Sequence, residues 1–148
     1  MFYKLNQLIR ENTKEEIFFE AGIAKESLGD AISEASGVII DVLKSQLDSG
    51  KARDLMNSFK GKKTEQELLI KMMIKKYTNR LNSYHDISTE KASELAFLVI
   101  PIVMKRFVLV TSTNVKEEKG IFTLLNWLSG NTVNFESFFL RVDELQIA

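Results

Sequence analysis

Apolar residues recur every three or four positions along most of this chain, which is the spacing of helices that bury one face. No stretch shows the sustained apolar–polar alternation of a half-buried β-strand. We therefore expect an all-α fold, a single-domain multi-helical bundle formed by residues 1–148. The pattern predicts helices over residues 2–11, 28–49, 52–59, 65–84, 89–110 and 119–129.

Residues that commonly begin or end helices mark the boundaries of these predicted helices. Two pairs have the spacing of a capping box, in which a threonine and a glutamate three residues later satisfy free amides. These pairs are Thr13/Glu16 and Thr64/Glu67. The predicted cap of helix 28–49 is Ser27, and its predicted stop is Gly50. Residues 111–118 are polar and predict a loop, and Asn134 is the predicted cap of a last helix.

Two stretches of the chain resemble each other. Residues 35–44 (ASGVIIDVLK) and 96–105 (AFLVIPIVMK) are identical at five of ten positions. Short helical segments follow both, so we predict two repeat units over approximately residues 27–62 and 88–131. Asp41 in the first copy corresponds to Ile102 in the second, which removes a polar position. We therefore expect residues 95–104 to be the central helix, buried all round, and helix 28–49 to carry Asp41 and Lys44 on its outer side.

Pro101 stands inside the predicted central helix. Proline cannot donate a backbone hydrogen bond, and its ring crowds the carbonyl of Phe97. One interpretation is that Pro101 only bends or breaks the helix there. In the other, the freed carbonyl of Phe97 binds a ligand.

Composition narrows the classes of function. Lys and Arg number 20, as do Asp and Glu, so no net field steers the chain toward nucleic acid or an anionic membrane. The absence of cysteine excludes disulfides, thiolate metal sites and cysteine nucleophiles, and it fits the cytoplasm. The longest apolar stretch, Leu95 to Met104, is about half of the roughly 20 residues that span a membrane. The N-terminus lacks the apolar run of a secretory signal.

Candidate chemistry is sparse. His85 is the only histidine, and it stands at a predicted helix boundary without a second metal ligand or a nucleophile nearby in sequence. It is interpreted as a loop or capping histidine. The carboxylate pairs Glu15/Glu16 and Glu117/Glu118 fall near helix starts, where the helix dipole favours negative charge. We predict no catalytic residue, cofactor or metal. A deep pocket that joins His85, Tyr84 and distant carboxylates would favour an enzyme instead.

The strongest polar signal is basic. Residues 60–80 hold seven Lys and Arg against two Glu, a local charge of 7 − 2 = +5. Lys71 and Lys75, like Lys76 and Arg80, are four residues apart and share the helix face opposite the apolar stripe. This face is either an ordinary solvated surface or a contact for the phosphate backbone of a nucleic acid.

Phenylalanines gather near both ends of the chain. Phe18 and Phe19 fall in an early segment, and Phe135, Phe138 and Phe139 fall in the predicted last helix. Both groups are consistent with core packing. The terminal group is also consistent with an interface to a partner protein or to a second copy of the chain.

Three segments together resemble the YidB-like proteins, small bacterial helical proteins: AGIAKESLGDAISEASGVIIDVLKSQLDSGKARDLMNSFKG, ISTEKASELAFLVIPIVMKRF and GIFTLLNWLSGN. The similarity covers roughly residues 21–131. It implies an all-helical bacterial protein and assigns no catalytic or binding residue. We expect a non-enzymatic helical interaction or structural module that self-associates or binds a protein partner. The alternative is a nucleic-acid-associated protein that uses the basic face.

Overall fold

The computed structural model describes residues 1–113 and 119–128, and its regular structure there is entirely helical. The predicted all-α multi-helical bundle is confirmed. Within the described ranges, none of the helices has the length and apolar character that crossing a bilayer would require. The elements are α1 (Phe2–Asn12), α2 (Glu15–Glu20), a 3₁₀ turn (Lys25–Ser27), α3 (Leu28–Asp48), α4 (Ala52–Phe59), α5 (Lys63–His85), α6 (Thr89–Thr113) and α7 (Lys119–Leu128).

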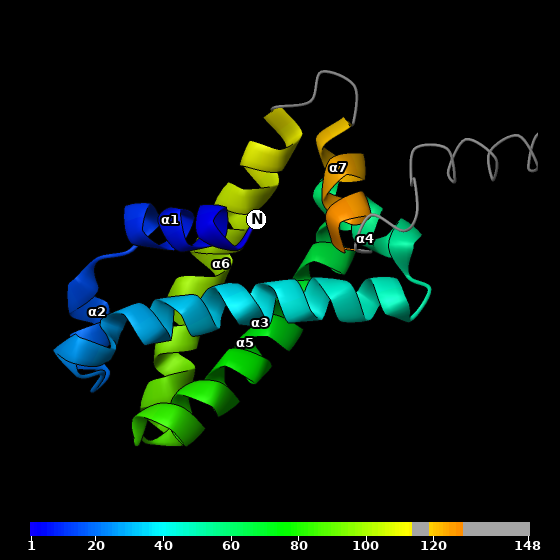
Figure 1. Cartoon of the computed structure of the whole chain (residues 1–148). Helices are drawn as coiled ribbons and strands as arrows, with labels where there is room; N and C mark the ends of the chain where they lie inside the picture. Colours follow the sequence, from blue (N-terminus) through cyan, green and yellow to red (C-terminus); the bar gives the residue numbers. More distant parts are fainter. Residues whose placement is uncertain (114–118, 129–148) are drawn as a thin grey trace, which may run out of the picture.

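Helices α5 and α6 form an antiparallel hairpin, and α3 crosses in front of it (Figure 1). Helix α1 packs against both α3 and α6, while α4 and α7 pack together near the far end of α3. Each long helix, α3 and α6, is followed by a short one, α4 and α7. This order is the one expected from the two predicted repeat units, whose common origin stays a prediction.

One core lies where these helices meet. Helix α5 contributes the predicted stripe Leu69, Met73, Tyr77 and Leu81, all of which are buried. Alanines with no exposed surface, Ala35 of α3 and Ala96 of α6, allow neighbouring helices to approach closely. At the other end, Phe59 of α4 meets Phe107 of α6 edge to face, with ring centroids 5.7 Å apart.

Gly50 follows the end of α3 as predicted, but the predicted capping boxes are wrong. Gly50 has φ +76°, a left-handed conformation that suits a residue after a helix end. Thr13 instead donates its hydroxyl to the Ile9 carbonyl of α1, at 2.6 Å. Helix α5 already includes Thr64, because it begins at Lys63 with Lys62 at the cap position. Ser27 occupies the predicted cap position of α3 but makes no side-chain capping bond there.

The turn from α5 to α6 is short and well defined. Asp86 has φ +52°, and the backbone amide of Lys91 donates to the Ser88 hydroxyl at 3.1 Å. Gly22, at φ +103°, lies against this turn: a Cβ atom there would be 3.0 Å from Cγ2 of Ile87. The turn from α2 toward α3 and the α5–α6 turn therefore touch at a position that only glycine fits.

Helix α6 continues through Pro101, which leaves the interpretation of a bend and excludes that of a break. It departs from the sequence prediction in two respects, the first being that it includes residues 111–113, which were expected to form a loop. It is also not buried all round: its inner side is in the core, whereas Phe97 and Leu98 are 67% and 50% exposed. Helix α3 is less peripheral than expected, because Asp41 accepts a hydrogen bond from Arg80 of α5; the Asp41 side chain is still 43% exposed, and Lys44 is exposed as predicted.

Candidate functional site

Helix α6 presents a second apolar surface to solvent. Every residue of α6 advances by about 100° around the helix axis, so residues three and four apart share a side. The core takes one side of α6. We call the opposite side the outer face of α6, and it comprises Ser93, Glu94, Phe97, Leu98, Pro101, Ile102, Lys105 and Leu109.

Large apolar side chains are unusually accessible on this outer face. Phe97 is 67% exposed, Leu98 50%, Ile102 48% and Leu109 45%. Single exposed apolar residues are ordinary, but several on neighbouring turns of one helix are typical of a binding surface. An open depression of about 490 Å³ lies between Ser93, Glu94, Phe97 and Leu98. The outer face thus combines apolar projections with a shallow recess.

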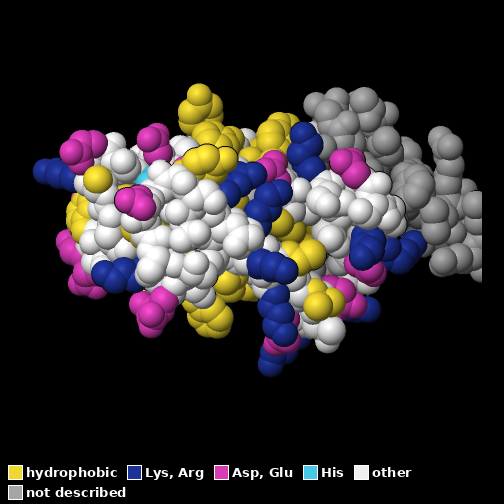
Figure 2. Space-filling model, turned by 90° about the horizontal axis from the view of Figure 1, so that it is seen from below, with side chains coloured by type: hydrophobic (Ala, Val, Ile, Leu, Met, Phe, Trp, Pro, Cys, Tyr) yellow, Lys and Arg dark blue, Asp and Glu magenta, His cyan; other side chains and the backbone are white. Residues whose placement is uncertain are grey.

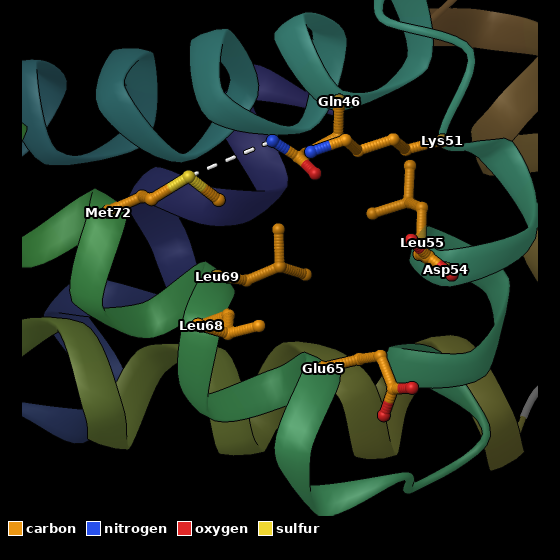
Figure 3. A pocket seen from close by; sticks show the side chains of 8 residues that line it. All are labelled: Gln46, Lys51, Asp54, Leu55, Glu65, Leu68, Leu69 and Met72. Atoms are coloured by element: carbon orange, nitrogen blue, oxygen red, sulfur yellow. Dashed lines mark hydrogen bonds between the residues drawn. The ribbon is translucent and has the colours of Figure 1, made fainter.

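A second apolar feature lies between the end of α3, α4 and the start of α5. Leucines form the middle of this pocket, and Lys51, Asp54 and Glu65 stand around its rim (Figure 3). Gln46 of α3 donates its side-chain amide to the sulfur of Met72 across it, at 3.7 Å. Its volume of about 210 Å³ is below the range of about 300–1,000 Å³ for small-molecule sites. Its size therefore suits a single apolar side chain better than a cofactor.

His85 is not the loop or capping histidine that we expected from the sequence. It is the last residue of α5, its side chain is only 6% exposed, and its Nε2 lies 2.6 Å from Oε2 of Glu34 on α3. The two residues are 51 positions apart, so their pairing was missed. One feature of the sequence indicates that Glu34 is partly buried. It stands three residues after Ala31 and four before Val38, a spacing that puts it at the edge of a buried stripe.

The His85–Glu34 pair lies in an open polar depression of about 520 Å³, lined by Ser27, Asp30, Ser33, Glu34, Arg80, Tyr84 and His85. A pocket that joins His85, Tyr84 and carboxylates would favour an enzyme, so the hydrogen bonds of His85 decide whether it can act as a catalytic base. Nucleophilic catalysis requires a hydroxyl hydrogen-bonded to the base. Within residues 1–113 and 119–128, neither Ser27 nor Ser33 makes such a bond to His85, whose Nε2 Glu34 already occupies. No three potential metal ligands converge in the same ranges.

The contacts around this depression hold α3 against α5. Tyr77 donates its hydroxyl to the Ala31 carbonyl at 2.7 Å. Arg80 donates to Asp41 at 2.7 Å, nearly three turns further along α3 than Ala31. With the His85–Glu34 pair, three polar contacts follow the crossing of the two helices. The arrangement supports a structural role for His85 at this crossing.

Burial raises the pKa of the Tyr77 hydroxyl far above its ordinary range, and the neighbouring charge of Glu34 raises it further. Below about pH 10 both the folded and the unfolded chain keep this proton, so its contribution to stability is complete. Above about pH 10 only the unfolded chain loses the proton. The free energy of unfolding should then fall by up to about 1.4 kcal/mol per pH unit.

The substitution Tyr77→Phe tests this expectation because it removes the ionisable group and keeps the ring. The variant should lose about 1 kcal/mol at neutral pH, the usual contribution of one hydrogen bond. Its alkaline slope should be shallower than that of the wild type. Urea unfolding of both proteins between about pH 8 and pH 11 measures the difference. Parallel slopes would contradict the assignment.

The predicted basic face divides into two parts. Lys71 and Lys75 are exposed, as expected. Lys76 and Arg80 instead approach one carboxylate oxygen of Asp41, at 3.7 Å and 2.7 Å. Seen from below, Lys and Arg side chains gather in a band across the middle of the face, with acidic and hydrophobic side chains among and beside them (Figure 2). A phosphate backbone would therefore meet a mixed surface on this side.

The structure tests the predicted core packing for only one of the two phenylalanine groups. Phe18 is buried in the core, whereas Phe19 is 36% exposed. Phe135, Phe138 and Phe139, and the predicted cap Asn134, lie outside the described residues. Their expected role as core or interface stays a prediction.

Comparisons with protein-family models, curated proteins and solved structures gave no match. The resemblance to the YidB-like proteins therefore stays a prediction. Any assignment of function depends on the surfaces described above.

Proposed function

We propose that this chain is a helical protein-interaction module that binds its partner through the outer face of α6. The observation that carries the proposal is the exposure of Phe97, Leu98 and Ile102 on adjacent turns of a helix whose other side already fills the core. Aromatic and apolar side chains at the centre of a surface, with charged residues beside them, are the usual composition of an interface. Glu94 and Lys105 supply the charges at the two ends of this face.

Packing among residues 1–113 and 119–128 does not account for these exposed side chains. In the aligned positions of α3, the sequence has Gly37 instead of Leu98 and Asp41 instead of Ile102. A helix at such a position can therefore carry small or polar residues. Full burial of one large apolar side chain contributes about 1.5–3 kcal/mol. For the outer face of α6, this free energy is gained when another molecule covers the exposed side chains.

Site-specific crosslinking tests the proposal. A photoreactive phenylalanine analogue at Phe97 keeps the aromatic side chain in place, and the same analogue at Tyr84 is a matched control. Tyr84 is similarly exposed, at 72%, but it belongs to α5. In cells that produce the protein, we expect covalent protein adducts from position 97 and few from position 84. Absence of adducts at position 97, or equal labelling at both positions, would contradict the proposal.

The nucleic-acid alternative makes a separate prediction. The net charge is zero, and Asp41 pairs with Lys76 and Arg80, two of the four residues of the predicted basic face. We therefore expect no saturable binding to duplex DNA or RNA at low salt. Fluorescence anisotropy measures this directly. If the wild type does bind, with an affinity that falls steeply with salt, then Lys71→Glu with Lys75→Glu should abolish binding. That result would favour the alternative.

A further inference from the structure

We propose that the partner of the outer face of α6 is a second copy of the same chain, packed with its α6 antiparallel to the first. This inference depends on the proposed function, because it names the molecule that covers the same surface. The inference rests on the order of side chains along the outer face, which is acidic, apolar, apolar and basic. This order is complementary to itself when a second copy runs in the opposite direction.

The middle of the outer face is a seam of four residues with successive spacings of four, three and four: Glu94, Leu98, Pro101 and Lys105. This is the spacing of a helix-packing stripe. Residues 94 and 105 are centred on position 99.5 along the helix, and so are residues 98 and 101. A two-fold axis at that point places Glu94 beside Lys105 of the second copy and Leu98 beside Pro101 of the second copy. Such a contact uses the same surface twice, as a symmetric dimer requires.

Charge complementarity selects the antiparallel orientation. Helix α6 is acidic at the N-terminal end of this face, with Glu94 and the preceding Glu90, and basic at the C-terminal end, with Lys105 and the adjacent Arg106, all exposed. Antiparallel packing brings acid to base at both ends. Parallel packing in register would bring Glu94 to Glu94 and Lys105 to Lys105, which is unfavourable. Lys91 is the exception to this separation, because it is a basic residue at the acidic end.

The residues on either side of the seam fit the same arrangement. Phe97 lies on one side of it and Ile102 on the other, because they are five residues apart around the helix. The two-fold axis brings each of them near its own counterpart, so apolar side chains line both edges. The depression between Ser93 and Leu98 then faces residues 101–106 of the second copy.

This contact is short, since only about three turns of each helix take part. Interfaces at the low end of the size range are weak and transient. We therefore expect a reversible dimer with a dissociation constant on the order of micromolar.

Exchange of the two charges provides the test, on the full chain by sedimentation equilibrium over a range of concentrations. Glu94→Lys and Lys105→Glu each place like charges together twice, so each variant alone should dimerise at least about tenfold more weakly. An equimolar mixture of the two should associate as the wild type does, as should the double variant. Glu67→Lys, an equal charge change on an exposed residue of α5, should have no effect.

Three results would overturn the inference: a wild type that stays monomeric at millimolar concentration, single variants that dimerise normally, or a mixture that does not recover. The crosslinking experiment separates these from failure of the proposed function. Adducts from position 97 that contain a different protein, together with a monomeric wild type, would reject the second copy and retain the interaction surface. A monomer with no adduct would reject both.

Discussion

Replacing Phe107 with alanine is expected to lower the free energy of unfolding by about 3–5 kcal/mol. Phe107 has no exposed surface, and its ring meets Phe59 edge to face at 5.7 Å. The substitution removes the packing of the ring and leaves a cavity between α4 and α6, because neighbouring side chains refill such a space only partly. Chemical denaturation followed by circular dichroism measures the loss.

Ile102→Ala is the matched control, because Ile102 lies on the same helix but is 48% exposed. Its loss should stay below about 1 kcal/mol. Phe59→Ala combined with Phe107→Ala should cost less than the sum of the two single changes, since both remove the same ring contact. Similar losses for Phe107→Ala and Ile102→Ala would show that α6 is not packed as described.

Replacing Glu34 with alanine is expected to destabilise the protein by about 1–3 kcal/mol, the cost of leaving a buried polar partner unsatisfied. His85 is 6% exposed and has its Nε2 2.6 Å from the Glu34 carboxylate, so it would lose its hydrogen-bond partner. Glu34→Gln keeps an acceptor in place and should cost less. Unfolding of the three proteins at neutral pH supplies the comparison.

Ser33→Ala is the control for this second experiment. Ser33 precedes Glu34 and lines the same polar depression, but the Nε2 atom of His85 is hydrogen-bonded to Glu34 and not to Ser33. Its effect should stay within about 0.5 kcal/mol. If Glu34→Ala were equally mild, His85 would not depend on Glu34, and the polar depression would need a role other than joining α3 to α5.

Local sequence signals predict most of the fold. Helix α4 has the predicted bounds, because apolar residues at helical spacing stand between Gly50 and Gly61. The capping boxes failed because a cap depends on where the backbone enters the helix. Helix α5 begins one residue before Thr64, so the Thr64 side chain is no longer at a cap position. A sequence motif of four residues does not fix that entry point.

The candidate site was only partly predictable. Apolar residues all around α6 are visible in the sequence, and they led to the prediction of complete burial. The pattern cannot distinguish a side of the helix that lies in the core from a side that lies in solvent, since Val99 and Leu98 differ little in hydrophobicity but are 0% and 50% exposed respectively. The His85–Glu34 pair was hidden for another reason: it depends on how α3 crosses α5.

The crossing of α3 and α5 also affects how the chain is made. Tyr77 and His85 follow their α3 partners, Ala31 and Glu34, by 46 and 51 residues. At a synthesis rate of roughly 5–20 residues per second, the buried stripe of α3 leaves the ribosome about 2–10 seconds before α5 can cover it. Of the helices made before α5, α1 and α4 both pack on α3. We therefore expect these two helices to cover part of the α3 stripe in the nascent chain until α5 is made.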